Sequence, residues 1–136
     1  MEKPVIEKII ISPEKLTEAK PSKVRIISDY KELHFDDVPI LYTGKNEENE
    51  IIIGSYLDED DDNKVIYELH TILTKEILDN FMSKKITYLD ILKSSDSIHL
   101  VEKRFSDSEI QKIYKISFDS INSGYLPTKD SYCPIQ

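Results

Sequence analysis

Three β-rich runs separated by short polar segments are the feature that most constrains how this chain folds. The runs are VPILYT at 38–43, EIIIGSYL at 50–57 and KVIYELH at 64–70, and the segments between them are GKNEEN and DEDDDN. β-Branched and aromatic residues favour strands, and the two connections have the length and composition of hairpin turns. The middle of the chain therefore predicts an antiparallel β-meander.

The third run also predicts which side chains share a face of the sheet. Successive side chains of a strand point to opposite faces. One face carries Val65, Tyr67 and Leu69, and the other carries Ile66, Glu68 and His70. One face is therefore more apolar than the other, as expected of an antiparallel sheet.

The hydrophobic period changes to that of helices after residue 73. Thr74 can cap a helix on which Ile77, Leu78 and Phe81 fall on one side. The stretch TYLD at 87–90 fits the capping-box pattern, with a threonine followed three residues later by an acid. It predicts a second short helix.

Strand patterns return at SIHLVEKRF, residues 97–105, and at IQKIYKISF, residues 110–118. In the second run Tyr114, Ile116 and Phe118 alternate as in a strand, although the preceding SDSE could also cap a helix. We favour a strand, because it would pair with 97–105 across a short turn. The predicted fold class is α+β, an antiparallel β-meander with two short helices inserted before a C-terminal β-hairpin.

Residues 1–28 are predicted to form an N-terminal arm, and residues 29–136 a single α+β domain. The arm is expected to contain a strand over 4–12, a short helix over 13–19 and another strand over 22–28. Such an arm could pair with a second chain, so a homodimer stays open.

Length and charge limit the classes of function. A chain of 136 residues fits one domain, and 26 acidic against 18 basic residues give a net charge of −8. This charge argues against direct nucleic-acid binding, which needs a basic surface. It suits a protein partner with a basic surface.

The sequence shows none of the segments that direct a protein to or across a membrane. The start MEKPVIEKIIISPEK is charged throughout, and Cys133 is the only cysteine. No apolar run approaches the roughly 18 residues of a membrane span. We therefore expect a cytoplasmic protein with no membrane partner. The use of 21 Ile against one Ala is typical of an AT-rich genome and favours a bacterial or phage origin.

The acidic run DEDDD begins like a calcium-binding loop but does not continue like one. Asp58, Asp60 and Asp62 have the required spacing. The sixth position holds Asn63 where the sharp turn needs Gly, and the twelfth holds Leu69 where a bidentate Glu closes the site. No metal site is therefore expected.

In a meander the acidic run and the start of the first predicted strand lie at the same end of the sheet. The acidic side chains would then crowd one rim, and their mutual repulsion suits a basic partner or a bound cation. A solvated turn that keeps the sheet edge soluble is the simpler alternative. This predicted acidic rim consists of Asp36, Asp37, Asp58, Glu59, Asp60, Asp61 and Asp62.

The sequence carries no catalytic or cofactor motif. His34, His70 and His99 lack the spacing of metal ligands, and Cys133 lies in the C-terminal tail. There is no G-x-S-x-G motif, and the three glycines cannot form a phosphate-binding loop. We therefore expect no catalytic residues and no cofactor. A site assembled across the sheet from His70, His99 and acidic residues stays an alternative.

The tail SGYLPTKDSYCP at 123–134 is aromatic and interrupted by proline. Tyr125, Leu126 and Tyr132 are too apolar to stay in solvent, so they either pack on the core or present a contact surface. Tyr125 and Leu126, together with the acidic rim, are the predicted partner-binding residues.

Three stretches, FDDVPILY, ITYLDILKSSDSIHLVE and GYLPTKDSYCP, resemble a family of small bacterial α+β proteins of unknown function. The resemblance covers roughly residues 28–134. It implies a bacterial or phage accessory protein and assigns no catalytic residues.

Together these features predict a non-enzymatic protein–protein interaction module that binds a basic partner. An accessory, immunity or inhibitor protein of a bacterial or phage conflict system would fit. Its binding would combine electrostatic steering by the acidic rim with a small apolar anchor. Two alternatives stay open: a DNA mimic that inhibits a nucleic-acid-binding protein, and a small enzyme whose site is not visible in the sequence.

Overall fold

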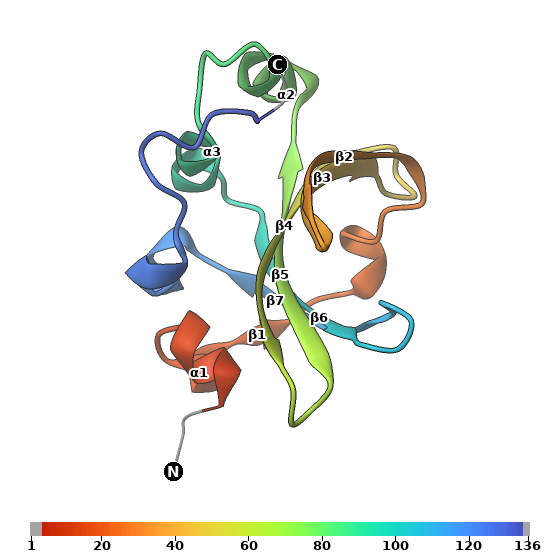
Figure 1. Ribbon diagram of the computed structural model, residues 1–136, viewed down its shortest axis with the longest axis vertical. Coiled ribbons are helices and arrows are strands. Elements are labelled where there is room, and N and C mark those ends of the chain that lie inside the picture. The colour runs from red at the N-terminus through yellow and green to blue at the C-terminus, as the bar shows by residue number, and fades with distance from the viewer. Residues whose placement is uncertain (1–3, 135–136) are drawn as a thin grey trace.

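The computed structural model describes residues 4–134, which form a seven-stranded antiparallel sheet with helices at its faces and ends (Figure 1). The strand order is β1-β7-β6-β5-β4-β3-β2, so six strands follow the chain order and β1 joins the edge beside β7. The strands are β1 Thr17–Glu18, β2 Ser28–Asp36, β3 Val38–Lys45, β4 Ile51–Asp60, β5 Val65–Leu73, β6 Ile98–Arg104 and β7 Ile110–Ile116. The predicted α+β class is confirmed.

The helices are short, and side-chain caps start two of them. They are α1 Val5–Ile9, α2 Lys75–Met82 and α3 Tyr88–Ser94. The Thr74 hydroxyl accepts a hydrogen bond from the backbone N–H of Ile77 at 3.2 Å, and Thr87 forms a full capping box with Asp90. Among residues 4–134 no helix is long and apolar enough to cross a membrane.

The N-terminal segment folds differently from its sequence pattern. The strand predicted over 4–12 is wrong, because residues 5–9 form α1. The predicted helix over 13–19 is only the 3₁₀ turn η1 Pro13–Lys15 followed by β1, and the predicted strand over 22–28 begins as the 3₁₀ turn η2 Pro21–Lys23. Packing explains α1, since Ile9 is fully buried against the sheet and outweighs the β-propensity of isoleucine.

Both faces of the sheet are covered, each by its own core. The larger core holds side chains of α1, α2, α3 and the C-terminal tail. The smaller core lies under residues 19–27 and is built from Val24, Ile52, Val101 and Ile113. Figure 1 shows α1 and α3 on one side of the sheet and the segment 19–27 on the other. Residues 4–28 therefore contribute to both cores.

The predicted faces of β5 agree with this arrangement. Val65, Tyr67 and Leu69 pack in the larger core. The opposite face carries Glu68 and His70, which are buried on the side of the smaller core. Glu68 and His70 are ionisable and yet lie inside the protein. If the sheet were covered on one face only, this face would be in contact with solvent.

Candidate functional site

Four polar side chains from three strands meet on the sheet face that residues 19–27 cover. Tyr42 comes from β3, Glu68 and His70 from β5, and Lys103 from β6. The register explains the meeting, because Tyr42 pairs with Gly54 and Gly54 pairs with His70 across the sheet. We call Tyr42, Glu68, His70 and Lys103 the buried polar cluster.

The contacts of the buried polar cluster converge on one oxygen, Oε1 of Glu68. Lys103 Nζ lies 2.8 Å from it and His70 Nε2 lies 3.0 Å from it, and the Tyr42 hydroxyl donates to it in a short hydrogen bond. Tyr42 Oη also lies 2.8 Å from His70 Nε2 and accepts from Lys103 Nζ at 2.9 Å. Each of the four side chains therefore contacts at least two of the other three.

Burial and charge determine the protonation of Glu68 and Tyr42. Burial alone would raise the pKa of Glu68, but the hydrogen bonds and charges of His70 and Lys103 outweigh it and lower this pKa to about 2. Burial and the nearby Glu68 carboxylate raise the pKa of Tyr42 far above its ordinary value. Glu68 is thus a carboxylate and Tyr42 a neutral phenol at neutral pH.

The buried polar cluster forms the floor of a cavity of about 670 Å³. The walls are largely apolar, and among the charged lining residues Arg25 Nη2 lies 3.1 Å from Glu109 Oε1. The lining residues besides the cluster include Arg25, Ile26, Ile27, Asp29, Tyr30, Val38, Pro39, Tyr56, Ile66, Glu109 and Ile110. The volume lies within the range of small-molecule sites.

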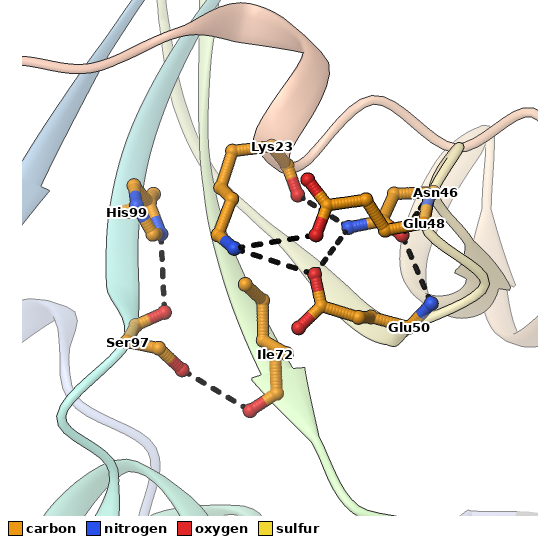
Figure 2. Close-up of polar contacts among 7 residues, drawn as sticks. All are labelled: Lys23, Asn46, Glu48, Glu50, Ile72, Ser97 and His99. Atoms are coloured by element: carbon orange, nitrogen blue, oxygen red, sulfur yellow. Dashed lines mark hydrogen bonds and ion pairs between the residues drawn. The ribbon is translucent and has the colours of Figure 1, made fainter.

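Residues 19–27 form the roof over His70, and the β3–β4 turn holds them in place. The backbone carbonyl of Val24 lies 3.1 Å from His70 Nδ1. Figure 2 shows how the preceding residue is tied down: Asn46 Nδ2 donates to the Lys23 carbonyl at 2.8 Å, and Lys23 Nζ lies 3.4 Å from Glu50. Asn46 thus holds the roof at Lys23, and the next residue, Val24, contacts the imidazole of His70.

Gly54 lets the Tyr42 ring pack closely against β4. A Cβ atom at Gly54 would lie only 2.7 Å from Cζ of Tyr42. Any side chain there would push the ring away, because real Cβ atoms do not approach so closely. The glycine in EIIIGSYL is therefore part of the site.

The predicted acidic run is not one open loop. β4 continues to Asp60, and the turn occupies residues 61–64. Asp60 is buried and shapes this turn, because its carboxylate accepts from the backbone N–H groups of Asp62 and Asn63, each at 3.1 Å, and from Asn63 Nδ2 at 2.7 Å. The hydrogen bonds from Asn63 lower the pKa of Asp60.

The other predicted partner-binding residues separate into two groups. We call the β4–β5 hairpin tip, residues 58–64, the acidic hairpin. Asp58 accepts a hydrogen bond from the Tyr125 hydroxyl at 2.6 Å, so the acidic hairpin contacts the tail. Leu126 and Tyr125 are half-buried against the larger core and line a groove of about 490 Å³. Asp36 ends β2 and Asp37 connects it to β3, and both are exposed.

Strand pairing does not join these two parts of the predicted acidic rim. The β3–β4 ladder ends at the Leu41–Ser55 pair, before it reaches the β2–β3 turn. The exposed carboxylates of the hairpin are those of Glu59, Asp61 and Asp62. They border a hollow of about 450 Å³ together with Lys8 of α1.

The other residues considered in the sequence as metal ligands or nucleophiles are His34, His99 and Cys133, and the structure does not bring them together. His99 pairs with His70 in the sheet, but its Nδ1 lies 3.1 Å from the Ser97 carbonyl (Figure 2), and burial lowers its pKa. His34 is exposed on β2, and Cys133 is buried with Sγ 3.7 Å from Met82 Sδ. Within residues 4–134 no three His, Cys, Asp or Glu side chains are placed to hold a metal ion.

The sequence placed Glu68 and His70 on one face of the third predicted strand but did not predict the buried polar cluster as a site. Glu68 and His70 stand two residues apart in an otherwise apolar run, so they share a face and form a visible signal. Tyr42 and Lys103 carry no such signal, because each looks like an ordinary strand residue.

Comparison with known proteins adds no name to this site. No family model matches the chain, and searches of curated proteins and of solved structures give no match.

Proposed function

We propose that the protein binds a small molecule in the cavity above the buried polar cluster. The observation that supports this most is the convergence of four hydrogen-bonding side chains at the floor of a largely apolar cavity of about 670 Å³. Apolar walls supply affinity, and a few placed polar groups supply orientation. Ionisable groups with displaced pKa values in a cavity are a signature of functional sites.

A purely structural role explains the buried polar cluster less well. Ionic groups inside a protein lose their hydration, and apolar side chains of similar volume often give equal or higher stability. The smaller core already contains Ile52 and Val101 on the same face. Apolar residues at Glu68, His70 and Lys103 would extend that core, so the presence of charges there favours a binding role.

Occupancy of the cavity can be tested by NMR with two small probes, hexanoate and hexanamide, at millimolar concentration. We expect at least one probe to shift the methyl signals of Val38 and Ile66 at the cavity wall. Ile110 lines the cavity, so in the variant Ile110→Trp the larger indole should occupy part of it and these shifts should disappear. Lys112→Trp is the matched control, because Lys112 is exposed two residues further along β7.

The proposal fails if neither probe moves the wall signals. It also fails if Ile110→Trp and Lys112→Trp respond alike, because the shifts would then come from binding elsewhere.

A second candidate function is the docking of a basic protein partner at the acidic hairpin. The observation that favours it is the hydrogen bond between Tyr125 and Asp58, which joins the hairpin to the apolar groove of the tail. Exposed carboxylates beside an apolar groove supply steering and an anchor. An accessory, immunity or inhibitor protein of a bacterial or phage system would use such a surface without catalysing a reaction.

Charge reversal tests the docking candidate. Glu59, Asp61 and Asp62 are exposed and can be changed together to Lys without removing the turn-forming Asp60. We expect the wild-type protein to capture a basic protein from a bacterial lysate at low salt, and the triple variant to lose it. The control reverses Glu14, Glu47 and Glu76, which are exposed elsewhere. Equal capture by both triple variants would contradict docking at the hairpin.

A further inference from the structure

We infer that the ligand of the cavity is a small carboxylate with an apolar body, selected by an excess positive charge at the cavity floor. This inference rests on the proposed function and names its ligand class. The hydrogen bonds of the buried polar cluster determine which of its atoms must carry a proton.

The first step concerns Nδ1 of His70. This atom lies 3.1 Å from the backbone carbonyl of Val24. A carbonyl oxygen only accepts hydrogen bonds, so Nδ1 carries a proton and donates it. If the imidazole is neutral, Nε2 must then present a lone pair.

The second step concerns Nε2 of the same ring. It lies 3.0 Å from the Glu68 carboxylate and 2.8 Å from the Tyr42 hydroxyl. A carboxylate cannot donate, and the single hydroxyl proton of Tyr42 is directed to Glu68. A lone pair on Nε2 would therefore face the carboxylate. A proton on Nε2 removes this conflict, because Nε2–H then donates to Glu68.

The third step is the charge of the buried polar cluster. With both ring nitrogens protonated, the imidazolium of His70 and the ammonium of Lys103 stand against one carboxylate, that of Glu68. The excess is one positive charge in a buried place, where an uncompensated charge is unfavourable. Of the acidic residues that line the cavity, Glu109 pairs with Arg25 and Asp29 pairs with Lys45. Glu32, opposite Tyr42 in the β2–β3 pair, is exposed to solvent and accepts from Tyr30, so it does not neutralise the buried excess.

The fourth step concerns the hydrogen-bond donors that a ligand would meet. The Lys103 ammonium has three N–H groups, and its partners among residues 4–134 are Glu68 and Tyr42, which leaves one for the ligand. Arg25 also lines the cavity and uses one of its donors on Glu109. A carboxylate can accept a hydrogen bond from either group. One excess charge matches a monocarboxylate, and the isoleucines of the wall match an apolar body.

The decisive experiment compares hexanoate with hexanamide on the wild-type protein by NMR titration. The two probes have the same chain and differ in charge, so a difference in affinity reports the charge of the floor. We expect hexanoate to bind at least about tenfold more tightly, as hydrogen bonds between charged groups would give. Lys103→Met should remove this preference, and Lys112→Met, with the same loss of charge on exposed β7, should keep it.

The results separate the two proposals. Equal binding of both probes in the cavity would overturn the carboxylate inference and leave the proposed function standing, whereas binding of neither would overturn both. The ¹⁵N signals of His70 in the ligand-free protein give a second test that needs no variant. Both nitrogens should show the shifts of N–H donors, and a ring with one unprotonated nitrogen would overturn the inference.

Discussion

Single residues decide whether the second face of the sheet is a core or a site. Glu68 is 6% exposed and yet ionised, because three donors converge on one of its oxygens. In the folded state its pKa is about 2, against an ordinary value of 4.5. A folded-state pKa below the unfolded value means that ionised Glu68 stabilises the folded protein.

This gives a pH dependence for the variant Glu68→Gln. The stabilisation by the carboxylate is complete above about pH 4.5 and is lost as the pH falls toward 2, and its size is about 3 kcal/mol. Urea denaturation should therefore show the wild type and Glu68→Gln far apart at pH 7 and converging between pH 4.5 and 2.5. Glu14→Gln, at an exposed carboxylate, should show only a small difference at pH 7. A constant gap for Glu68→Gln at all pH values would contradict the structure.

Gly54 allows a sharp comparison between two glycines. In Gly54→Ala the new methyl group would meet the Tyr42 ring at 2.7 Å, whereas Gly124→Ala would meet no atom within 4 Å. Overpacking of this kind destabilises a protein by about 1–3 kcal/mol. Thermal denaturation should show this loss for Gly54→Ala and almost none for Gly124→Ala. Equal effects would mean that Tyr42 does not lie across Gly54.

At the scale of elements, a single turn controls the roof of the cavity. The buried side chain of Asn46 accepts from the backbone N–H groups of Glu48 and Glu50 at 3.0 and 2.9 Å and donates to the Lys23 carbonyl at 2.8 Å. Its Oδ1 therefore shapes the β3–β4 turn, while Nδ2 of the same amide holds η2. The roof over His70 depends on this one amide.

Asn46→Ala should loosen the roof more than it changes the sheet. Loss of these buried hydrogen bonds is expected to cost about 2 kcal/mol. The N–H of Val24 donates to the Pro21 carbonyl at 3.3 Å. Native-state hydrogen exchange of this N–H should be faster in the variant than in the wild type, and the increase should be larger than for the N–H groups in the centre of β5. Asn80→Ala on α2 is the control and should leave exchange at Val24 unchanged. Uniform acceleration across the sheet would argue against a local role for Asn46.

At the scale of the whole molecule, the N-terminal residues are part of the packed structure. Val24 and Ile9 are fully buried, one in each core, and β1 extends the sheet beside β7. Without these residues Ile52 and Val101 would be exposed on the second face. An isolated chain of 29–136 should therefore lack a cooperative unfolding transition and a dispersed NMR spectrum. A well-folded 29–136 would instead support the predicted division into an arm and a domain.

Sequence patterns predicted the centre of the molecule better than its beginning. In β3, β4 and β5 the alternation of apolar residues and the hairpin turns are local signals, and the sheet follows them. β2 went unpredicted, because only Leu33 of its nine residues is buried and no apolar period appears. Residues 5–9 were misassigned as strand, because isoleucine-rich sequence fits either a strand or a one-turn helix packed on a core.

The candidate site, too, was predictable only where the signal is local. The sequence by itself determined that Glu68 and His70 share a strand face opposite Leu69, since this follows from the two-residue period of a strand. Only the tertiary structure decided that this face is buried, because residues 19–27 cover it, and that Lys103 and Tyr42, 61 residues apart, complete the cluster. The physical reason is that hydrogen-bond geometry and burial depend on which distant segments pack together, and no local period encodes that choice.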